Sequence, residues 1–417
     1  MPNEANGAES GALTVVADVL AGSPVTVESP AVMGLIDQIA SAAFERERDN
    51  IPPHEVIDWI RHARLGAIAI PAHRGGGGSS VRNVLEIVMH LAEADPNVAH
   101  ILRNHFFFVE SLIRGLSEPS SVRWEHEVLS GAIFSLAQTE LGSHSAGISS
   151  NATSLVAEGD GYRLSGTKYY STGCMFSDYL VVGATDPSGN KATVIVPAHR
   201  EGVAHIDDWD GIGQRLTGSG TTVFRDTRVE PDDLVPAADE GAPQQANLKA
   251  FAQLYLTALI AGIMRAVLRD AVGLVRSRQR TFYHAPAEKP VDDPILQLVV
   301  GQLSSEAFAA EAMVLAAADA LDDLERASEE QVLEHQLSQR ASLRAAMAKI
   351  VVDELAIRSA GRLFDCGGAT ATRQLLQLDR HWRNIRTIAN HNPDHYKARS
   401  IGQFEISGTP LPSGAFF

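Results

Sequence analysis

The chain has very few cysteines and no cluster of basic residues, and both shortages exclude classes of protein. Cys174 and Cys366 are the only cysteines among 417 residues, too few for a disulfide framework or a four-thiolate zinc site. Asp and Glu number 51 against 35 Lys and Arg, a formal net charge of −16. Such an acidic chain is a poor partner for nucleic acid and for anionic membranes. We therefore expect a cytoplasmic protein with neither of these partners.

Several familiar signatures are missing as well. No arginine or lysine precedes Arg46, so a targeting segment is not expected, and no run of about 20 apolar residues predicts a membrane span. The glycines of 75–78 lack the βαβ context of a dinucleotide site and the lysine of a phosphate loop, so they indicate a tight turn. No GxSxG elbow is present. His391 and His395 have a metal-pair spacing, but Pro393 breaks the helix between them, so no metal is expected.

The hydrophobic pattern divides the chain into blocks. Residues 1–30 are rich in Ala, Gly, Ser and Pro and are interpreted as a loose leader. Apolar residues recur at helical spacing over 31–128, at spacing two with turn residues over 129–240, and at helical spacing again over 241–395. Residues 396–417 form a tail that we expect at a subunit interface. The pattern predicts an α+β protein, mostly α, with a helical domain, a central antiparallel barrel or sandwich, and a helical bundle.

Five motifs follow one another along the helical and β blocks. They are Leu65-Gly66-Ala67 with Pro71 and Gly75-Gly76, Ala137-Gln138-Thr139-Glu140-Leu141-Gly142-Ser143, Gly166-Thr167-Lys168-Tyr169-Tyr170-Ser171-Thr172-Gly173, Gly211-Ile212-Gly213-Gln214-Arg215-Leu216-Thr217-Gly218-Ser219 and Val223-Phe224-Arg225-Asp226-Thr227-Arg228-Val229. In this order they resemble the acyl-CoA dehydrogenase superfamily over roughly residues 30–400. The resemblance implies a four-helix bundle at the C-terminal end, a flavin between the β-domain and that bundle, and a homotetramer.

The catalytic base of the dehydrogenases is absent from its usual positions. These enzymes use a carboxylate to remove the α-proton of an acyl thioester. The segment 383–393 matches the usual region, and His391 stands in place of the glutamate. The alternative position, on the first bundle helix, is also empty, because 251–268 contains no Asp or Glu. A locally bonded histidine at a helix end is the alternative interpretation of His391.

A second departure concerns the cofactor. In the family, an arginine-led motif ending in glycine contacts the pyrophosphate of FAD. Here the matching run is Arg276-Ser277-Arg278-Gln279-Arg280-Thr281-Phe282, with Arg280 at the glycine position. A guanidinium suits a terminal phosphate and crowds the adenylate path. The substitution favours FMN over FAD, and a solvated basic helix end is the alternative.

With these two substitutions, the chain resembles the flavin-dependent monooxygenase branch of the superfamily. That branch includes dibenzothiophene monooxygenases and sulfur-acquisition oxidoreductases. The matching segments include Asp207-Asp208-Trp209, Arg380-His381-Trp382-Arg383-Asn384 and His391-Asn392-Pro393. The resemblance implies a two-component enzyme to which a separate reductase supplies reduced FMN. Oxygen then gives a flavin C4a-hydroperoxide that oxygenates sulfur in a small organosulfur compound. One departure is Leu136, where the branch often has asparagine.

The resemblance assigns roles to individual residues. The catalytic candidates are His391, His105 and Thr172, the last at a strand position facing the flavin N5. Without the resemblance, His105 is a core histidine, Thr172 a threonine of β-propensity and Trp209 a packing anchor. The cofactor candidates are Gln138, Thr139, Thr172, Arg280, Gly367 and Gly368, and the substrate-pocket candidates are His105, Tyr170, Trp209 and Leu136.

Other functions stay open at this point. An acyl-CoA dehydrogenase or oxidase with FAD is one, because 137–142 resembles the oxidase version of its motif. A flavin-dependent amine N-oxygenase would use the same oxygen chemistry. A non-catalytic flavin-binding protein is the third alternative. The sequence does not name the substrate.

Overall fold

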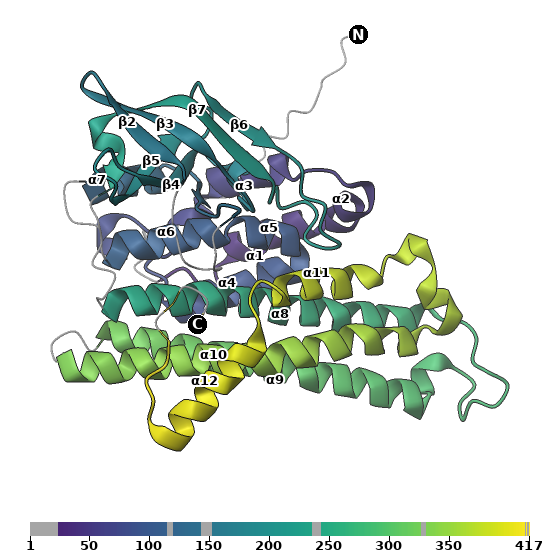
Figure 1. The fold of residues 1–417 in the computed structure, drawn as a ribbon. Helices are drawn as coiled ribbons and strands as arrows, with labels where there is room; N and C mark the ends of the chain where they lie inside the picture. Colours follow the sequence, from purple (N-terminus) through teal and green to yellow (C-terminus); the bar gives the residue numbers. More distant parts are fainter. Residues whose placement is uncertain are drawn as a thin grey trace, which may run out of the picture.

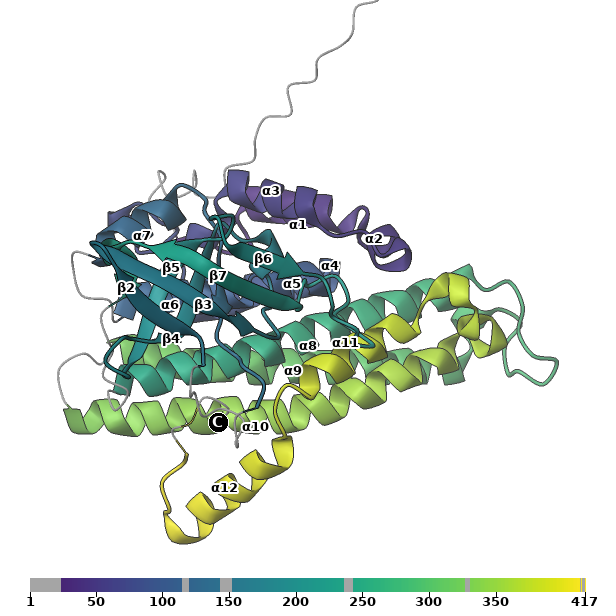
Figure 2. The ribbon, with the colours of Figure 1, turned by 45° about the horizontal axis from the view of Figure 1, so that its top comes forward.

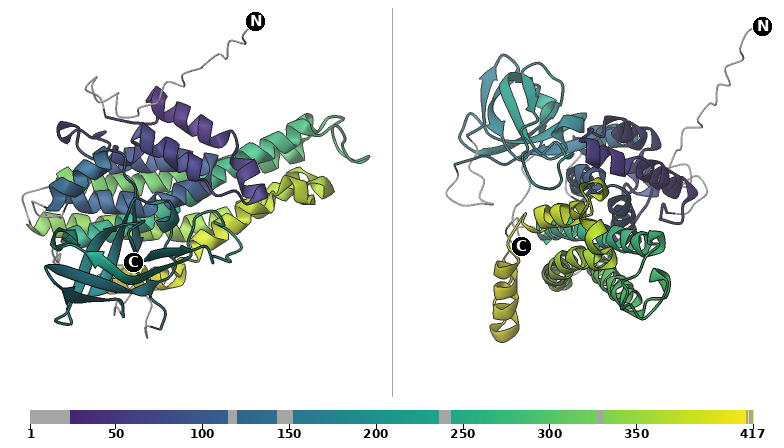
Figure 3. Two further views of the ribbon diagram at one scale, coloured as in Figure 1. Left: turned by 90° about the horizontal axis from the view of Figure 1, so that it is seen from above. Right: turned by 90° about the vertical axis from the view of Figure 1, so that its right-hand side faces the viewer.

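Helices from the two ends of the chain and one β-sheet form three layers in the computed structural model (Figure 1). The structure describes residues 24–114, 120–142, 152–235, 243–326, 331–412, 414 and 417. Most of the expected leader, together with Ser143 of the second motif, lies outside these residues. The N-terminal helices form a middle layer, with the sheet on one side and the long C-terminal helices on the other (Figures 1 and 3).

The N-terminal layer is built from short amphipathic helices around a buried apolar core. The Asp95 carboxylate caps α5 by accepting hydrogen bonds from the backbone N–H groups of Asn97 and Val98. The glycine run confirms the tight turn, because a Cβ at Gly76 or Gly77 would collide with the backbone of Ile70 or Ile68. The helices are α1 (Pro30–Ala40), α2 (Ala43–Asp49), α3 (His54–Ala63), α4 (Val81–Ala94), α5 (Pro96–Ile101), α6 (Arg103–Arg114) and α7 (Ser120–Leu129), with the short turns η2 (Leu65–Ala67) and η3 (Ala72–Arg74).

The central block folds into one eight-stranded sheet with the order β6-β7-β3-β2-β4-β5-β8, and β1 pairs with β4 off this path. Most pairings are antiparallel, as expected, but β1 and β2 each pair with β4 in parallel. The sheet has its own apolar core. The strands are β1 (Phe134–Ala137), β2 (Ser154–Glu158), β3 (Gly161–Lys168), β4 (Tyr179–Thr185), β5 (Lys191–Pro197), β6 (Val203–Ile206), β7 (Thr221–Val229) and β8 (Leu234–Val235).

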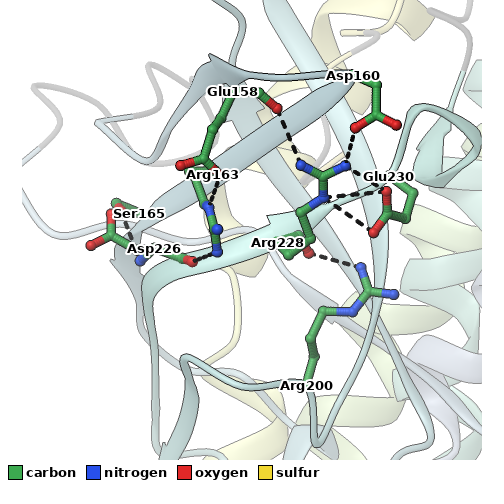
Figure 4. A network of polar contacts seen from close by, with 8 residues as sticks. All are labelled: Glu158, Asp160, Arg163, Ser165, Arg200, Asp226, Arg228 and Glu230. Carbon is green, nitrogen blue, oxygen red and sulfur yellow. Dashed lines mark hydrogen bonds and ion pairs between the residues drawn. The ribbon is translucent and has the colours of Figure 1, made fainter.

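An arginine-centred network holds the outer ends of these strands together (Figure 4). The Arg228 guanidinium donates to Asp160 at 2.5 Å, to Glu230 at 2.9 Å and to the carbonyl of Glu158 at 3.1 Å. Arg163 pairs with Glu158 and donates to the carbonyl of Asp226. These groups are largely exposed, so the network fixes strand ends and is not part of a buried site.

The C-terminal block is a bundle built around α8. α8 packs against α4, α9 and α10, and Gly262 allows α4 to come close, because a Cβ there would lie 2.3 Å from the Met89 carbonyl oxygen. α12 projects away from the bundle (Figure 2). The predicted fold class is confirmed. The helices are α8 (Pro243–Ser277), α9 (Pro294–Arg326), α10 (Gln331–Arg362), α11 (Asp379–Ala389) and α12 (Asp394–Ser407).

Two bundle helices are long and apolar enough to cross a membrane by composition alone, contrary to the expectation from the sequence. In α8 the apolar window is 89% buried inside the fold, which is the burial of a core helix. In α9 it is only 28% buried. Ile295, Leu298 and Phe308 are exposed on α9 of the single chain, so this helix presents an uncovered apolar face.

Candidate active site

A polar network lies where the N-terminal helices, two loops of the sheet and the bundle meet. α5 and α6 bring His100, Arg103 and Asn104 to it. The turn after β3 brings Thr172, and the loop between β6 and β7 brings Gln214, Thr217 and Ser219. The bundle contributes Gln253 on α8 and the segment His391-Asn392 between α11 and α12. Three separate parts of the chain therefore converge on one place.

Thr172 connects the first two of these parts. Its carbonyl accepts a hydrogen bond from Asn104 Nδ2 at 3.0 Å, and its hydroxyl lies 2.8 Å from that of Ser219. Ser219 in turn lies 2.7 Å from the Thr217 hydroxyl, which donates to the Gln214 carbonyl at 2.7 Å. β3 ends at Lys168, so Thr172 lies in a turn and not on a strand as the resemblance implied.

His391 lies directly after α11 and next to the buried Asn392. The Asn392 amide donates to Gln253 Oε1 at 2.5 Å and faces His391 Nδ1 at 3.3 Å. An amide N–H is a donor, so Nδ1 accepts and the imidazole proton lies on Nε2. The side chain is exposed in the single chain, although many protein atoms lie around it.

The electrostatic environment of His391 is positive. Burial holds the pKa of His391 well below its usual value, and the charges of Arg103, Lys349 and Lys397 act in the same direction. The imidazole is therefore neutral at neutral pH. A neutral donor in a cationic setting suits an anionic ligand or an oxygen atom that gains negative charge.

His100 is a member of the network that sequence reasoning missed. Its Nδ1 lies 2.9 Å from Gln214 Oε1, and burial, with Arg103 next, lowers its pKa to about 4. Two histidines, His100 and His105, lie close together in the sequence. Only His105 precedes a marked apolar run, so the local pattern indicates His105 and not His100. The position of His100 at the end of α5, facing the Gln214 loop, depends on a contact 114 residues away.

His105 has the environment of a core histidine, contrary to its assignment to catalysis and to the pocket. It is fully buried, with Nε2 3.0 Å from the Gly66 carbonyl oxygen and Nδ1 accepting from the Phe134 N–H at 3.1 Å. Burial lowers its pKa to about 4. Both ring nitrogens form hydrogen bonds with backbone groups, so the side chain connects η2 to β1.

Tyr170 and Trp209 form an aromatic pair beside the network, with ring centroids 6.2 Å apart in a T-shaped arrangement. Tyr170 has a left-handed backbone (φ 54°) and is 59% exposed. Trp209 Nε1 donates to the Gln214 carbonyl at 3.1 Å. Leu136 is half-buried on β1, paired with Val181. These three positions stay predicted pocket residues.

Gln138 and Thr139 follow β1 and are exposed, with Gln138 Nε2 donating to the Val181 carbonyl at 3.0 Å. Next to them, Glu140 pairs with the fully buried Lys168 at 2.6 Å. Partial burial raises the pKa of Glu140, but hydrogen bonds from Lys168, Thr153 and Ala152 outweigh it and lower the pKa to about 2. The predicted flavin residues of this motif therefore sit on a firmly held turn.

Arg280 and the glycines 367–368 lie at the other end of α8. Arg280 is exposed in the loop after this helix, and Arg278 donates to the Cys366 carbonyl at 2.9 Å, which brings the loop and the glycine turn together. α8 continues from Gln253 in the network to Ser277, which at 1.5 Å per residue is about 36 Å. The predicted cofactor residues therefore form two separate groups within one chain.

Comparison with known proteins identifies the relatives of this chain. Residues 254–393 match the family "Acyl-CoA dehydrogenase, C-terminal domain". The "Probable FMNH2-dependent monooxygenase SfnC" of Pseudomonas putida is 28% identical, covering 91% of this chain and 95% of that protein. A dibenzothiophene monooxygenase of Mycolicibacterium goodii is also 28% identical, over 89% of this chain and 92% of that one.

Solved structures agree with these relatives. FMN-bound TdsC from Paenibacillus sp. A11-2 superimposes with a TM-score of 0.84 at 28% identity, covering 92% of this chain and 98% of that chain. The methanesulfinate monooxygenase MsuC of Pseudomonas fluorescens gives a TM-score of 0.83 at 25% identity, over 93% and 98% of the two chains. Residues 254–393 therefore match the C-terminal domain of the acyl-CoA dehydrogenases, and the chain as a whole is similar in sequence and fold to these flavin monooxygenases.

Proposed function

We propose that this chain is a two-component, FMN-dependent monooxygenase that oxygenates the sulfur of a small organosulfur compound. The observation that carries the proposal is His391, a neutral donor near several cationic side chains at the position where dehydrogenases have a carboxylate base. The relatives named for FMNH2-dependent and dibenzothiophene monooxygenase activity support it. A two-component enzyme receives reduced flavin from a separate reductase, and no dinucleotide fingerprint for NAD(P)H is present in the sequence.

The residues of the network fit a flavin. Within the described residues, two buried amide atoms of the network, Gln214 Nε2 and Asn392 Oδ1, have no hydrogen-bond partner. Buried polar groups are normally satisfied, so these atoms indicate a ligand with both acceptors and donors. The positive field at His391 suits the anionic reduced form of FMN. When bound, FMN supplies the electrons that activate oxygen.

The protein residues then have distinct tasks. His391 Nε2–H donates a hydrogen bond to the oxygen atom that is transferred or released, which lowers the cost of the negative charge that develops there. The Thr172 hydroxyl, held by Ser219, adds a second polar contact. We assign Tyr170 and Trp209, the aromatic pair beside the network, to limiting the access of water. A single such hydrogen bond or proton contribution is worth roughly 10²–10⁴ in rate.

Arg280 completes the proposal through a second copy of the chain. A flavin that contacts His391 cannot reach Arg280 of the same chain, because α8 separates them by about 36 Å. We therefore assign Arg280, with the Gly367-Gly368 turn, to the terminal phosphate of a flavin bound by a neighbouring subunit in a homotetramer. The uncovered apolar face of α9 provides a surface for such an assembly.

The location of the protein follows from the same kind of argument. Cys174 and Cys366 are both free and buried, which suits the reducing cytoplasm. We retain the proposal that the enzyme is cytoplasmic.

The decisive experiment supplies FMN, NADH and an unrelated flavin reductase, and measures product and oxygen uptake. The substrate panel contains dibenzothiophene, a dialkyl sulfone, methanesulfinate, indole and an amino sugar, which separates S-oxygenation from N-oxygenation. We expect an oxygenated sulfur product that requires the reductase. Bleaching of bound flavin by an acyl-CoA, or FAD binding tenfold tighter than FMN (about 1.4 kcal/mol), would instead support the dehydrogenase.

A further inference from the structure

Gln214 is a buried loop residue whose backbone is held by several hydrogen bonds. It is 1% exposed and has a left-handed backbone (φ 54°), a conformation that is unfavourable for a non-glycine residue. Its N–H donates to Asn384 Oδ1 at 2.6 Å. Its carbonyl accepts from the Thr217 hydroxyl at 2.7 Å and from Trp209 Nε1 at 3.1 Å. Contacts from α11 and from its own loop therefore hold a strained residue in place.

The side chain of Gln214 meets His100 in the active-site network. The two atoms in contact are Gln214 Oε1 and His100 Nδ1, 2.9 Å apart. An amide oxygen can only accept, so Nδ1 carries the imidazole proton and Nε2 carries the lone pair. This is the opposite tautomer from His391, in which Nδ1 accepts from Asn392 and Nε2 carries the proton.

We propose that Gln214 is a positioning residue that holds His100 in the Nδ1–H tautomer, so that His100 accepts a hydrogen bond in the site where His391 donates one. Two neutral imidazoles of opposite polarity select a hydroxyl-bearing group. Its oxygen accepts from His391 Nε2–H while its proton is donated to His100 Nε2. The inference rests on the proposed function, because such a group arises there when oxygen is activated.

The other atom of the same amide supplies independent support. Gln214 Nε2 is buried and lacks a partner among the described residues. A buried donor without a partner is unfavourable, so its retention next to His100 indicates a ligand acceptor. Gln214 thus orients His100 with its oxygen and presents its nitrogen to the ligand.

The tautomer can be measured without any turnover. The chain is labelled with ¹⁵N in its histidine rings and studied at pH 7 by long-range ¹H–¹⁵N correlation, and the His100 signals are those lost in His100→Gln. We expect His100 to carry its proton on Nδ1. A proton on Nε2 in the native chain would overturn the inference, whether or not any substrate is oxygenated.

Gln214→Glu tests the consequence for the reaction. The carboxylate would favour a doubly protonated His100. The positive charge of Arg103 on α6 opposes this protonation, and Tyr255 on α8 and His391 after α11 also lie near Arg103. We expect product formation at pH 7 to fall at least 100-fold and to recover as pH rises, while FMN affinity changes less than about threefold. An equal loss at every pH indicates a structural role and contradicts the inference.

Gln339→Glu provides the matched control. Gln339 Nε2 lies 3.2 Å from His335 Nε2 on the exposed part of α10, so the same change is made in a glutamine–histidine pair outside the network. Its rates and pH profile should equal those of the native chain. If the native chain oxygenates nothing on the panel, the proposed function fails, and the ring spectra still decide the tautomer.

Discussion

Three histidines, His100, His105 and His391, differ in role but share a neutral state. His100 and His105 are buried, and burial lowers the pKa of each to about 4. The pKa of His391 is lowered by burial and by neighbouring cations. A neutral imidazole can donate from one nitrogen and accept at the other, which a protonated ring cannot. Both the core and the proposed chemistry depend on this property.

The first prediction concerns acid stability. Below about pH 6.5 the unfolded chain binds protons at His100 and His105 that the folded chain does not bind until about pH 4. Stability is therefore lost as pH falls through this window, by about 1.4 kcal/mol per pH unit for each histidine. Urea unfolding at several pH values measures the slope.

His105→Gln isolates one of these groups. The amide can replace both hydrogen bonds of the ring without titrating, so the slope between pH 6.5 and 4.5 should become smaller by about one proton. His62→Gln, on the exposed side of α3, is the control and should keep the native slope. An unchanged slope in His105→Gln would show that His105 is not neutral in the folded chain.

The second prediction concerns His391. His391→Ala removes the Nε2–H donor, so product formation should fall roughly 10²–10⁴-fold. FMN binding should stay nearly intact, and hydrogen peroxide release should rise because oxygen still reacts with reduced flavin. Product, peroxide and FMN affinity are measured on the same preparation.

His391→Glu separates the two enzyme classes. It restores the carboxylate of the dehydrogenase pattern at the same position. If the native chain dehydrogenates an acyl-CoA and the variant does so faster, the monooxygenase proposal is wrong. If only the native chain oxygenates sulfur and neither form acts on acyl-CoA, the imidazole serves oxygen transfer.

Some of these residues could be predicted from the sequence and others could not. His391, Thr172 and Trp209 stand within motifs, so the resemblance of these motifs to a family predicts that the three residues lie near one another. His100 and Gln214 become partners only through a contact between α5 and a loop far along the chain. A local pattern carries no information about such a contact.

At the scale of secondary-structure elements, the turn after β1 depends on one buried ion pair. Lys168 at the end of β3 is fully buried, and its ammonium lies 2.6 Å from Glu140. The Glu140 carboxylate also accepts hydrogen bonds from the N–H groups of Ala152 and Thr153, just before β2. One carboxylate therefore joins the ends of β1 and β3 to the start of β2.

The third prediction follows from this pair. Glu140→Gln leaves Lys168 as a buried charge without its counter-ion, which costs about 3–5 kcal/mol. Lys168→Met in the same chain should restore much of this loss, because a buried pair replaced by an apolar side chain is often close to neutral. Urea unfolding of the two single variants and the double variant measures the coupling. Additive losses would show that the pair does not act as a unit.

The elements themselves were predictable to different extents. Long helices such as α8, α9 and α10 follow from apolar spacing sustained over many turns, and paired turns mark several strands. The parallel pairing of β1 with β4 could not be seen, because the four residues of β1 lie far in sequence from their partner. The apolar window of α8 also shows that composition does not distinguish a core helix from a membrane span.

At the scale of the whole molecule, the tail has partners within its own chain. Lys397 on α12 is buried, and its ammonium lies 5.0 Å from the centroid of the Phe417 ring. Tyr396 and Ile406 remain exposed on this projecting helix. The expectation that residues 396–417 pack at a subunit interface therefore stays a prediction, with these two side chains as its contact candidates.

The fourth prediction tests whether two copies of the chain share one flavin. Arg280→Ala removes the proposed phosphate contact and His391→Ala the proposed donor, so each variant alone should be almost inactive. In a mixed assembly, a site with His391 from one copy and Arg280 from the other is intact. Random mixing at equal amounts should then restore about a quarter of the native activity.

The variants are co-expressed with different affinity tags, and assemblies that carry both tags are assayed. Mixing an Arg280→Ala chain with a tagged copy of itself is the control and should restore nothing. If the doubly tagged assemblies remain inactive while each variant still assembles, Arg280 and His391 do not act on the same flavin across a subunit boundary.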